Sequence, residues 1–352
     1  MNKYSRPSYY NSSNFSALHS AFIITILIAS ILYGFTVCHP ESPAHIAGGK
    51  IEESDIKVYR KVVEQIHAGK SYYAVAGNEL RRVGYPASSI FNWRLPALAW
   101  LLGQLPSIRT GRVIALILAT TTLLIWFTVF VKYQYARWQV FFGGLILSGP
   151  LMYPLLHTTL FLFHEYWAGT LISLSLAAHA RGWRYASIIS GLMALFLREL
   201  SLPFVCIMMI LAYIENQRRE ALLWFTGILC FGGELLIHWS IVSKLITEND
   251  KVLHGGWIVF GGWPFVLNTA QMHPFFLISP PWVAAIILPL ALFGLACWRD
   301  SAGIRVACTV GIYVLAFMIV GLPFNGYWGL MYAFILPLGL LHVPYALKKI
   351  RF

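Results

Sequence analysis

Charged residues are scarce in this sequence. Of the 352 residues, 11% are charged and 58% are hydrophobic. In an ordinary soluble domain about a quarter of the residues are charged. So few charges do not cover the surface of a soluble protein of this size, and most of the outside is expected to face lipid. The composition predicts a multi-pass membrane protein and argues against a soluble catalytic domain.

Cysteine is scarce as well, and its spacing carries no pattern. The five cysteines are odd in number, form no CxxC pair and lie mostly in apolar runs. This argues against a disulfide framework or a zinc site. Cys38 follows the first apolar segment, but Phe35, Thr36 and Val37 before it make a poor lipoprotein cleavage signal. We therefore expect Cys38 to be unmodified.

The common nucleotide and hydrolase motifs are missing. There is no P-loop, GxSxG, HExxH or dinucleotide fingerprint, so this chain alone is not expected to drive transport with ATP. The net charge of +12 includes no basic stretch with interleaved aromatic residues. Nucleic acid is therefore not an expected partner. In a membrane protein, excess Lys and Arg is typical of cytoplasmic loops.

Apolar runs predict the membrane topology. The run 18–37 follows a polar tail (1–17) and is long enough for an uncleaved anchor whose N-terminus lies inside. The basic clusters are expected inside, at 132–137, 181–184, 218–219, 299–305 and 348–352. The short loops expected outside are 157–165, 244–256 and 322–328.

This alternation allows one crossing between the anchor and Lys132. The stretch 93–105 is short and contains Arg94 and Pro96, so we expect it to lie at the outer interface. The prediction is an all-α bundle of about ten transmembrane helices, with a large outer loop at 38–112, the bundle at 113–347 and a second outer loop at 241–276. The expected spans are 18–37, 113–131, 138–155, 166–180, 184–198, 201–214, 221–240, 277–297, 303–321 and 329–346.

One pair of these spans is interrupted by charge. Arg198 and Glu199, with Ser201 and Pro203 after them, separate 184–198 from 201–214. We place this break near the outer face, since Arg184 then lies inside. A single tilted helix is the alternative, and it would bury both charges at mid-bilayer, where charge is costly.

The outer loop contains the first candidate residues. Asp55 lies in the first turn of an amphipathic helix predicted to end near Gly69, where a carboxylate also stabilises the helix dipole. Further on, Tyr73 and Arg94 lie in stretches rich in Trp and Tyr. Such stretches are typical of a membrane interface. The alternative is a cleft where the planar guanidinium of Arg94 binds a phosphate.

Two further clusters combine opposite charges next to spans. His164 and Glu165 begin one span, and this pair is suited to ligate a divalent ion or to transfer a proton. Arg198 and Glu199 are adjacent, so they are expected to face different partners. Weaker candidates for a cleft are Lys251, His254, Asn325, Tyr327 and Trp328. Glu234 and His238 share one helix face, and no role is assigned to them.

The order of these motifs resembles the C-type (GT-C) membrane glycosyltransferases, especially the mannosyltransferase-like and aminoarabinose-transferase-like members. An anchor is followed by a long outer loop with an early acidic residue, here Asp55. The loop continues through a Gly-x-x-Tyr-Tyr stretch at 69–73 into an interfacial helix at 93–106 that begins with aromatic–Arg–x–Pro. Glu165 follows at the end of the short outer loop 157–165, and a Leu-Arg-Glu break lies at 197–199. The resemblance covers most of residues 18–240.

The resemblance implies sugar transfer from a polyprenyl-phosphate donor to a lipid or glycan acceptor at the outer interface. It implies Asp55 as general base, with Glu165 as a second catalytic residue. Substrate and phosphate would be bound by Tyr59, Tyr73, Arg94, His164, Arg198 and Glu199. His164 and Glu165 would hold a possible divalent cation, Mg²⁺ or Mn²⁺. The expected location is a bacterial inner membrane, with both termini cytoplasmic and the active site on the periplasmic face.

Other functional classes fit the same span count. A secondary transporter or lipid flippase would show paired halves with broken helices in matching places. A structural subunit would need no ionisable residues gathered on one side. An outer-face acyltransferase would be expected to have a His-x4-Asp or similar pattern in an outer loop, and this sequence has none there. The transporter or flippase is the main alternative.

Overall fold

The fold is built of helices. A computed structural model describes residues 15–37, 52–156, 159–252, 256 and 258–350. These residues contain no strand, and their one β feature is an isolated bridge between Ile258 and Val320. The all-helical fold class is confirmed. Most of the expected N-terminal tail, Cys38, the start of the outer loop (38–51), His254 and residues 351–352 lie outside the described residues.

Most of the helices follow one another with short connections. The first half comprises α1 (Ala17–Val37), α3 (Glu52–His67), α4 (Tyr72–Val83), η3 (Ile90–Trp93), α5 (Pro96–Gly103), α6 (Ile108–Lys132), α7 (Arg137–Leu147), α8 (Gly149–Leu156), η4 (Leu160–Leu162) and α9 (His164–Arg181). The second half comprises α10 (Arg184–Leu197), η5 (Glu199–Ser201), α11 (Leu202–Ile214), α12 (Arg218–Leu245), α13 (Gly262–Ala270), α14 (Pro274–Leu277), α15 (Trp282–Cys297), α16 (Ser301–Ile319), η6 (Pro323–Met331), η7 (Leu336–His342) and α17 (Val343–Leu347).

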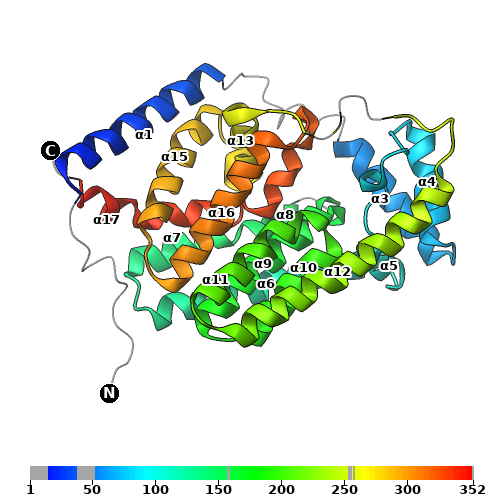
Figure 1. The fold of residues 1–352 in the computed structure, drawn as a ribbon, viewed down its shortest axis with the longest axis horizontal. Coiled ribbons are helices and arrows are strands. Elements are labelled where there is room, and N and C mark those ends of the chain that lie inside the picture. Colours follow the sequence, from blue (N-terminus) through cyan, green and yellow to red (C-terminus); the bar gives the residue numbers. More distant parts are fainter. Residues whose placement is uncertain (1–14, 38–51, 157–158, 253–255, 257, 351–352) are drawn as a thin grey trace.

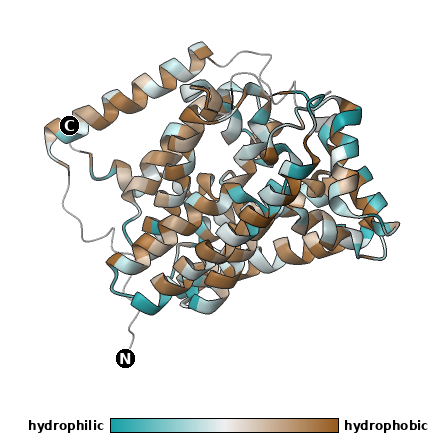
Figure 2. Cartoon of the chain, turned by 45° about the vertical axis from the view of Figure 1, so that its right-hand side comes forward, coloured by the Kyte–Doolittle hydropathy of each residue, from teal (hydrophilic) through white to brown (hydrophobic). Residues whose placement is uncertain are grey.

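Helices α3, α4 and α5 lie together at one end of the bundle, at the right of Figure 1. With η3 they form a unit that we call the cap. Helix α3 is amphipathic, and its face with Val58, Val62 and Ile66 is buried. Arg81 of α4 pairs with Asp250, at 2.7 Å, which ties the cap to the chain beyond α12. Figure 2 shows the cap as more hydrophilic than the helices of the bundle.

The opposite end of the bundle gathers the basic loops, and we call it the basic end. Lys132 Nζ donates to the carbonyl of Ala180 at 2.9 Å, which joins the ends of α6 and α9. Arg184, the first residue of α10, donates to Gln217, which follows α11. The end of α11 therefore lies at the same end of the bundle as the start of α10. The predicted break between these two helices is present, because Arg198 is extended and ends α10. The N–H of Phe15 donates to the carbonyl of Lys349 at 2.9 Å, so α1 begins beside the C-terminal helix.

Among the described residues, five helices are long and apolar enough to span a membrane: α1, α6, α7 with α8, α12 and α16. Their outward side chains include many large apolar groups, such as Phe22, Ile117 and Ile237, which suits a lipid environment. The expected number of about ten spans is not confirmed. Three other apolar helices have 10–17 residues, and helix α9 includes several polar residues.

The last expected span, 329–346, is not one straight helix. Two segments, Pro323–Met331 and Leu336–Leu347, are bent by 60° at a short break and together would make a sixth span. Much of this region forms 3₁₀ helix, with Pro323 and Pro337 each in the first turn of its helix. Helix α13, which precedes α14 and α15, also packs inside the bundle, because almost all of its residues are buried.

Candidate functional site

The site lies where the cap meets the bundle. Six ionisable residues approach one another there, and we call them the ionisable cluster: Asp55, Arg94, His164, Glu165, Arg198 and Glu199. They come from α3, from the turn between η3 and α5, from the start of α9 and from the α10–η5 junction. All six were predicted from the sequence. Tyr59 of α3 lies among them, and Tyr327 and Trp328 of η6 complete the wall.

Asp55 is a buried carboxyl with one strong partner. Its exposed fraction is 9%, and burial raises its pKa above the usual value near 3.8. The hydroxyl of Tyr85 donates to Oδ1, and the charge of Arg94 also favours the carboxylate, so both lower the pKa. The charge of Glu165 raises it. Burial has the largest effect, which makes Asp55 a better proton acceptor than an exposed aspartate.

Arg94 is held in place by neutral oxygen atoms. Its Nε donates to the Tyr59 hydroxyl at 3.2 Å, and its Nη2 donates to the Tyr327 hydroxyl at 2.8 Å. Among the described residues no carboxylate forms an ion pair with it. Its positive charge is thus not neutralised by direct contact, which suits a guanidinium that receives an anion.

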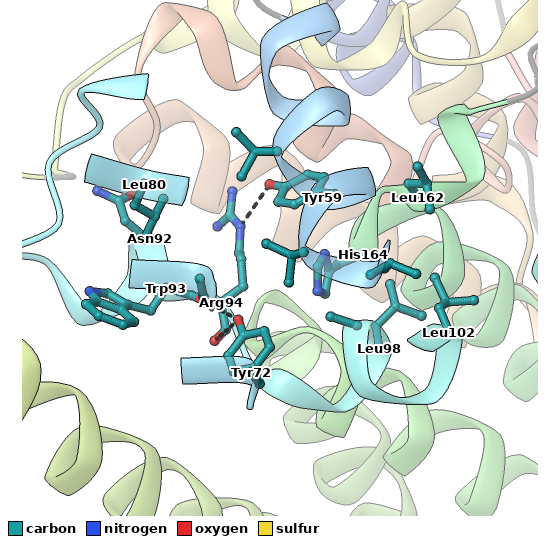
Figure 3. A pocket seen from close by; sticks show the side chains of 15 residues that line it. Tyr59, Tyr72, Leu80, Asn92, Trp93, Arg94, Leu98, Leu102, Leu162 and His164 are labelled. Atoms are coloured by element: carbon teal, nitrogen blue, oxygen red, sulfur yellow. Dashed lines mark hydrogen bonds between the residues drawn. The ribbon is translucent and has the colours of Figure 1, made fainter. Parts of the chain in front are cut away.

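The backbone of Arg94 is strained. Its φ of 56° and ψ of 163° lie in a region that only glycine adopts readily. Such strain costs about 1–3 kcal/mol and is common at functional sites. The hydroxyl of Tyr72 donates to the carbonyls of Trp93 and Arg94, and the Trp93 indole donates to Ala87 at 2.8 Å. These bonds hold the turn that directs Arg94 toward Tyr59 (Figure 3).

Arg198 lies between two carboxylates. Its Nε is 2.7 Å from Glu165, and its Nη1 contacts Glu199. Arg198 and Glu165 are almost completely buried. The guanidinium also lies 6.0 Å from the centre of the Trp328 ring, a cation–π arrangement. Although the two residues are adjacent in sequence, Arg198 and Glu199 contact each other, contrary to the expectation that they face different partners.

His164 packs edge-on against Tyr59, with ring centres 5.4 Å apart. The positive charges of Arg94 and Arg198 both lie near the His164 ring. The exposed fraction of His164 is 3%. Neither ring nitrogen makes a hydrogen bond of good geometry among the described residues, although the backbone of Leu95 lies close to the ring. A ligand that enters between the two arginines would meet this imidazole.

A pocket inside the cap opens beside these residues (Figure 3). Its walls are mostly apolar, from Val58, Val62, Leu98 and Leu102 among others. Tyr59, Arg94 and His164 form its polar side. The free space is about 30 Å³, which holds only a water or two. A larger ligand therefore requires the cap to move.

Tyr73 does not lie in the ionisable cluster. Its hydroxyl lies 3.1 Å from His238 Nδ1 on α12. The neighbouring Tyr72 takes the place expected for Tyr73, since its hydroxyl bonds to the backbone of Arg94. The two rings pack edge-on, with centres 5.2 Å apart, but their hydroxyls bond to different partners. The sequence has no signal for which hydroxyl reaches Arg94.

Three aromatic residues contact the ionisable cluster although the sequence contains little or no indication of it. Tyr85 follows Asp55 by 30 residues, a distance at which no sequence pattern predicts a contact. Tyr327 and Trp328 were only weak candidates for a cleft, yet they contact Arg94 and Arg198. Their exposed fractions of 3% and 4% would not have been expected of an outer turn.

A divalent cation does not fit the cluster as it is arranged. Glu165 is occupied by Arg198, and His164 faces two guanidinium groups. No three His, Cys, Asp or Glu residues among those described approach closely enough to hold a metal ion. The predicted Mg²⁺ or Mn²⁺ stays a prediction, and no chemical step below is derived from it.

No protein-family model, no curated protein and no solved structure matches this chain. The resemblance to C-type glycosyltransferases therefore stays a hypothesis based on the order of motifs.

Proposed function

We propose that this chain is a membrane glycosyltransferase that moves a sugar from a polyprenyl-phosphate donor to an acceptor hydroxyl. The observation that carries the proposal is the convergence of Asp55, Arg94 and the Arg198–Glu165 pair between the cap and an apolar bundle. A lipid-linked donor needs this combination, because its phosphate needs a cation and its tail needs lipid. We place the site on the outer face of a bacterial inner membrane.

In the proposed reaction Asp55 accepts the proton of the acceptor hydroxyl. The acceptor oxygen forms a bond to the anomeric carbon, and the bond from that carbon to the phosphate oxygen breaks. The leaving group is a polyprenyl phosphate, which carries one more negative charge than it did in the donor. The Tyr85 hydroxyl already donates a hydrogen bond to Oδ1 of Asp55. Oδ2 makes no hydrogen bond within the described part of the chain and is the oxygen available to the acceptor.

Arg94 is the main phosphate-binding group in this proposal. It has neutral partners, whereas Arg198 is already paired with two carboxylates. A preorganised cation at the point where charge develops lowers the barrier. Arg198 acts through Glu165 and Glu199, which it positions beside the sugar. His164 is the additional donor to the phosphate.

The test is sugar transfer in proteoliposomes that contain a radiolabelled polyprenyl-phosphate sugar and a lipid acceptor. We expect Asp55→Asn to lower the transfer rate by about 10²–10⁴-fold, the usual contribution of a general base. Glu64→Gln is the matched control, because Glu64 is an exposed acid on the same helix α3. The assignment fails if the Asp55→Asn enzyme transfers sugar at the rate of the control.

Lipid translocation is the second candidate function. Its support is the 60° bend between Pro323–Met331 and Leu336–Leu347, because broken helices are typical of transporters. A flippase would move a fluorescent polyprenyl-phosphate sugar across proteoliposomes without any acceptor. Movement without transfer, unaffected by Asp55→Asn, would favour this candidate over the glycosyltransferase.

A further inference from the structure

The basic end of the bundle contains a cavity that the proposed function does not use. It has a volume of about 390 Å³ and lies where the α11–α12 connection meets the start of α10. This size falls in the range of small-molecule sites in proteins. Its polar lining comes from Arg184, Arg218, Arg219, Asn216, Gln217 and Glu220.

The cavity has an excess of positive charge. Arg184 lies 3.5 Å from Glu220 and also donates to Gln217. Glu220 is buried and is shared with His179, at 3.4 Å. Arg218 and Arg219 are exposed, and neither has an acidic partner within the described residues. Two guanidinium groups at this cavity are therefore available to an anion.

Apolar side chains lie at the mouth of the same cavity. Tyr185 is 73% exposed and Leu223 is 41% exposed, and both line it. On adjacent turns of α10 and α12, Ile189 and Leu222 are also exposed, at 60% and 62%. A polar ligand without a tail would leave this apolar surface uncovered. A ligand with an anionic head and hydrocarbon chains would cover both parts.

We propose that this cavity binds the headgroup of an anionic phospholipid, with the phosphate on Arg218 and Arg219 and the acyl chains along α10 and α12. Guanidinium groups donate two parallel hydrogen bonds to a phosphate. Basic pockets between membrane helices are suited to anionic headgroups. Sugar transfer at the other end of the bundle does not enter this argument, so the two proposals stand or fail independently.

The test is native mass spectrometry of the purified full chain in detergent with equal amounts of phosphatidylglycerol and phosphatidylcholine of identical chains. We expect bound phosphatidylglycerol to exceed phosphatidylcholine, and the excess to fall by about fivefold for each arginine removed in Arg218→Gln/Arg219→Gln. Arg137→Gln is the matched control, since Arg137 is exposed at the same end but outside the cavity. It should keep the full preference.

A charge-preserving variant and a competition experiment complete the test. Arg218→Lys/Arg219→Lys keeps the charges and should keep most of the preference, so a general folding defect of the Gln variant would be recognised. Glycerol phosphate, added in equal amount, should not displace phosphatidylglycerol, because it lacks chains to contact Tyr185 and Leu223. Equal binding of the two lipids, an unchanged preference in the Gln variant, or displacement by glycerol phosphate would each overturn the proposal.

Discussion

Two opposing influences act on the ionisation of Asp55. Burial disfavours the carboxylate, while the Tyr85 hydroxyl and the Arg94 charge favour it. Because burial dominates, the pKa is raised, and the ionised base is lost as the pH falls through this raised value. An acidic limb of the transfer rate should therefore appear above the pH at which an ordinary aspartate titrates.

Tyr85→Phe tests this balance. The change removes the hydrogen bond that stabilises the carboxylate, so the pKa of Asp55 should rise further and the acidic limb should move to higher pH. The rate on the plateau should change much less than the position of the limb. The measurement is the pH profile of single-turnover sugar transfer. An unmoved limb would mean that another group controls it.

At the residue scale, the sequence selected charged residues that the fold brings together, and it missed several aromatic contacts. Glu165 was selected because charge beside a membrane span is costly. Arg94 was selected because a guanidinium suits phosphate, and Asp55 was selected from the resemblance. The partners Tyr72 and Tyr85 are aromatic residues in a chain rich in them, and nothing local distinguishes them from an interfacial belt. Only the three-dimensional fold shows which hydroxyls turn inward.

At the element scale, apolar runs predicted the helices that face outward. Helices α1, α6 and α12 are long, apolar and exposed, and the predicted ranges lie within or close to them. Helix α9 is different, because almost all of its residues are buried by neighbouring helices. Its polar residues face protein rather than lipid. Hydropathy does not distinguish this case from a surface helix, since it takes no account of helix neighbours.

The close approach of α9 to η6 depends on one glycine. A Cβ atom at Gly169 would lie 2.0 Å from the carbonyl oxygen of Leu330, a backbone atom that has little freedom to move. We expect Gly169→Ala to lower the midpoint of thermal unfolding, since overpacking costs about 1–3 kcal/mol. Transfer should also fall, because η6 carries Tyr327 and Trp328.

The matched control is Gly232→Ala on α12. No atom lies within 4 Å of the added Cβ atom there, and alanine favours a helix over glycine. Its unfolding midpoint should stay the same or rise. Equal midpoints for the two variants in a detergent thermal-shift assay would show that α9 and η6 do not pack as closely as described.

At the scale of the whole molecule, charge divides the bundle into two ends. Arg184, Arg305 and Lys132 lie at the basic end, where Arg305 pairs with Glu215 at 2.7 Å. The ionisable cluster lies at the other end, beside the cap. The alternation of basic loops in the sequence led us to expect these basic loops on one side of the membrane, and this sidedness stays a prediction. The sequence was not sufficient to predict the number of spans, because short and bent segments have no clear hydropathy signal.

Cysteine labelling from outside the cell tests which end faces out. Glu165 and Arg198 are too buried to report, so the probes belong on exposed positions. In a cysteine-free background, a membrane-impermeant maleimide should label Lys61→Cys and Glu248→Cys, which lie at the cap end. Tyr185→Cys at the basic end should be labelled only after permeabilisation, because positive loops stay inside. The reverse pattern would place Asp55 on the cytoplasmic side and remove the basis for an outer-face glycosyltransferase.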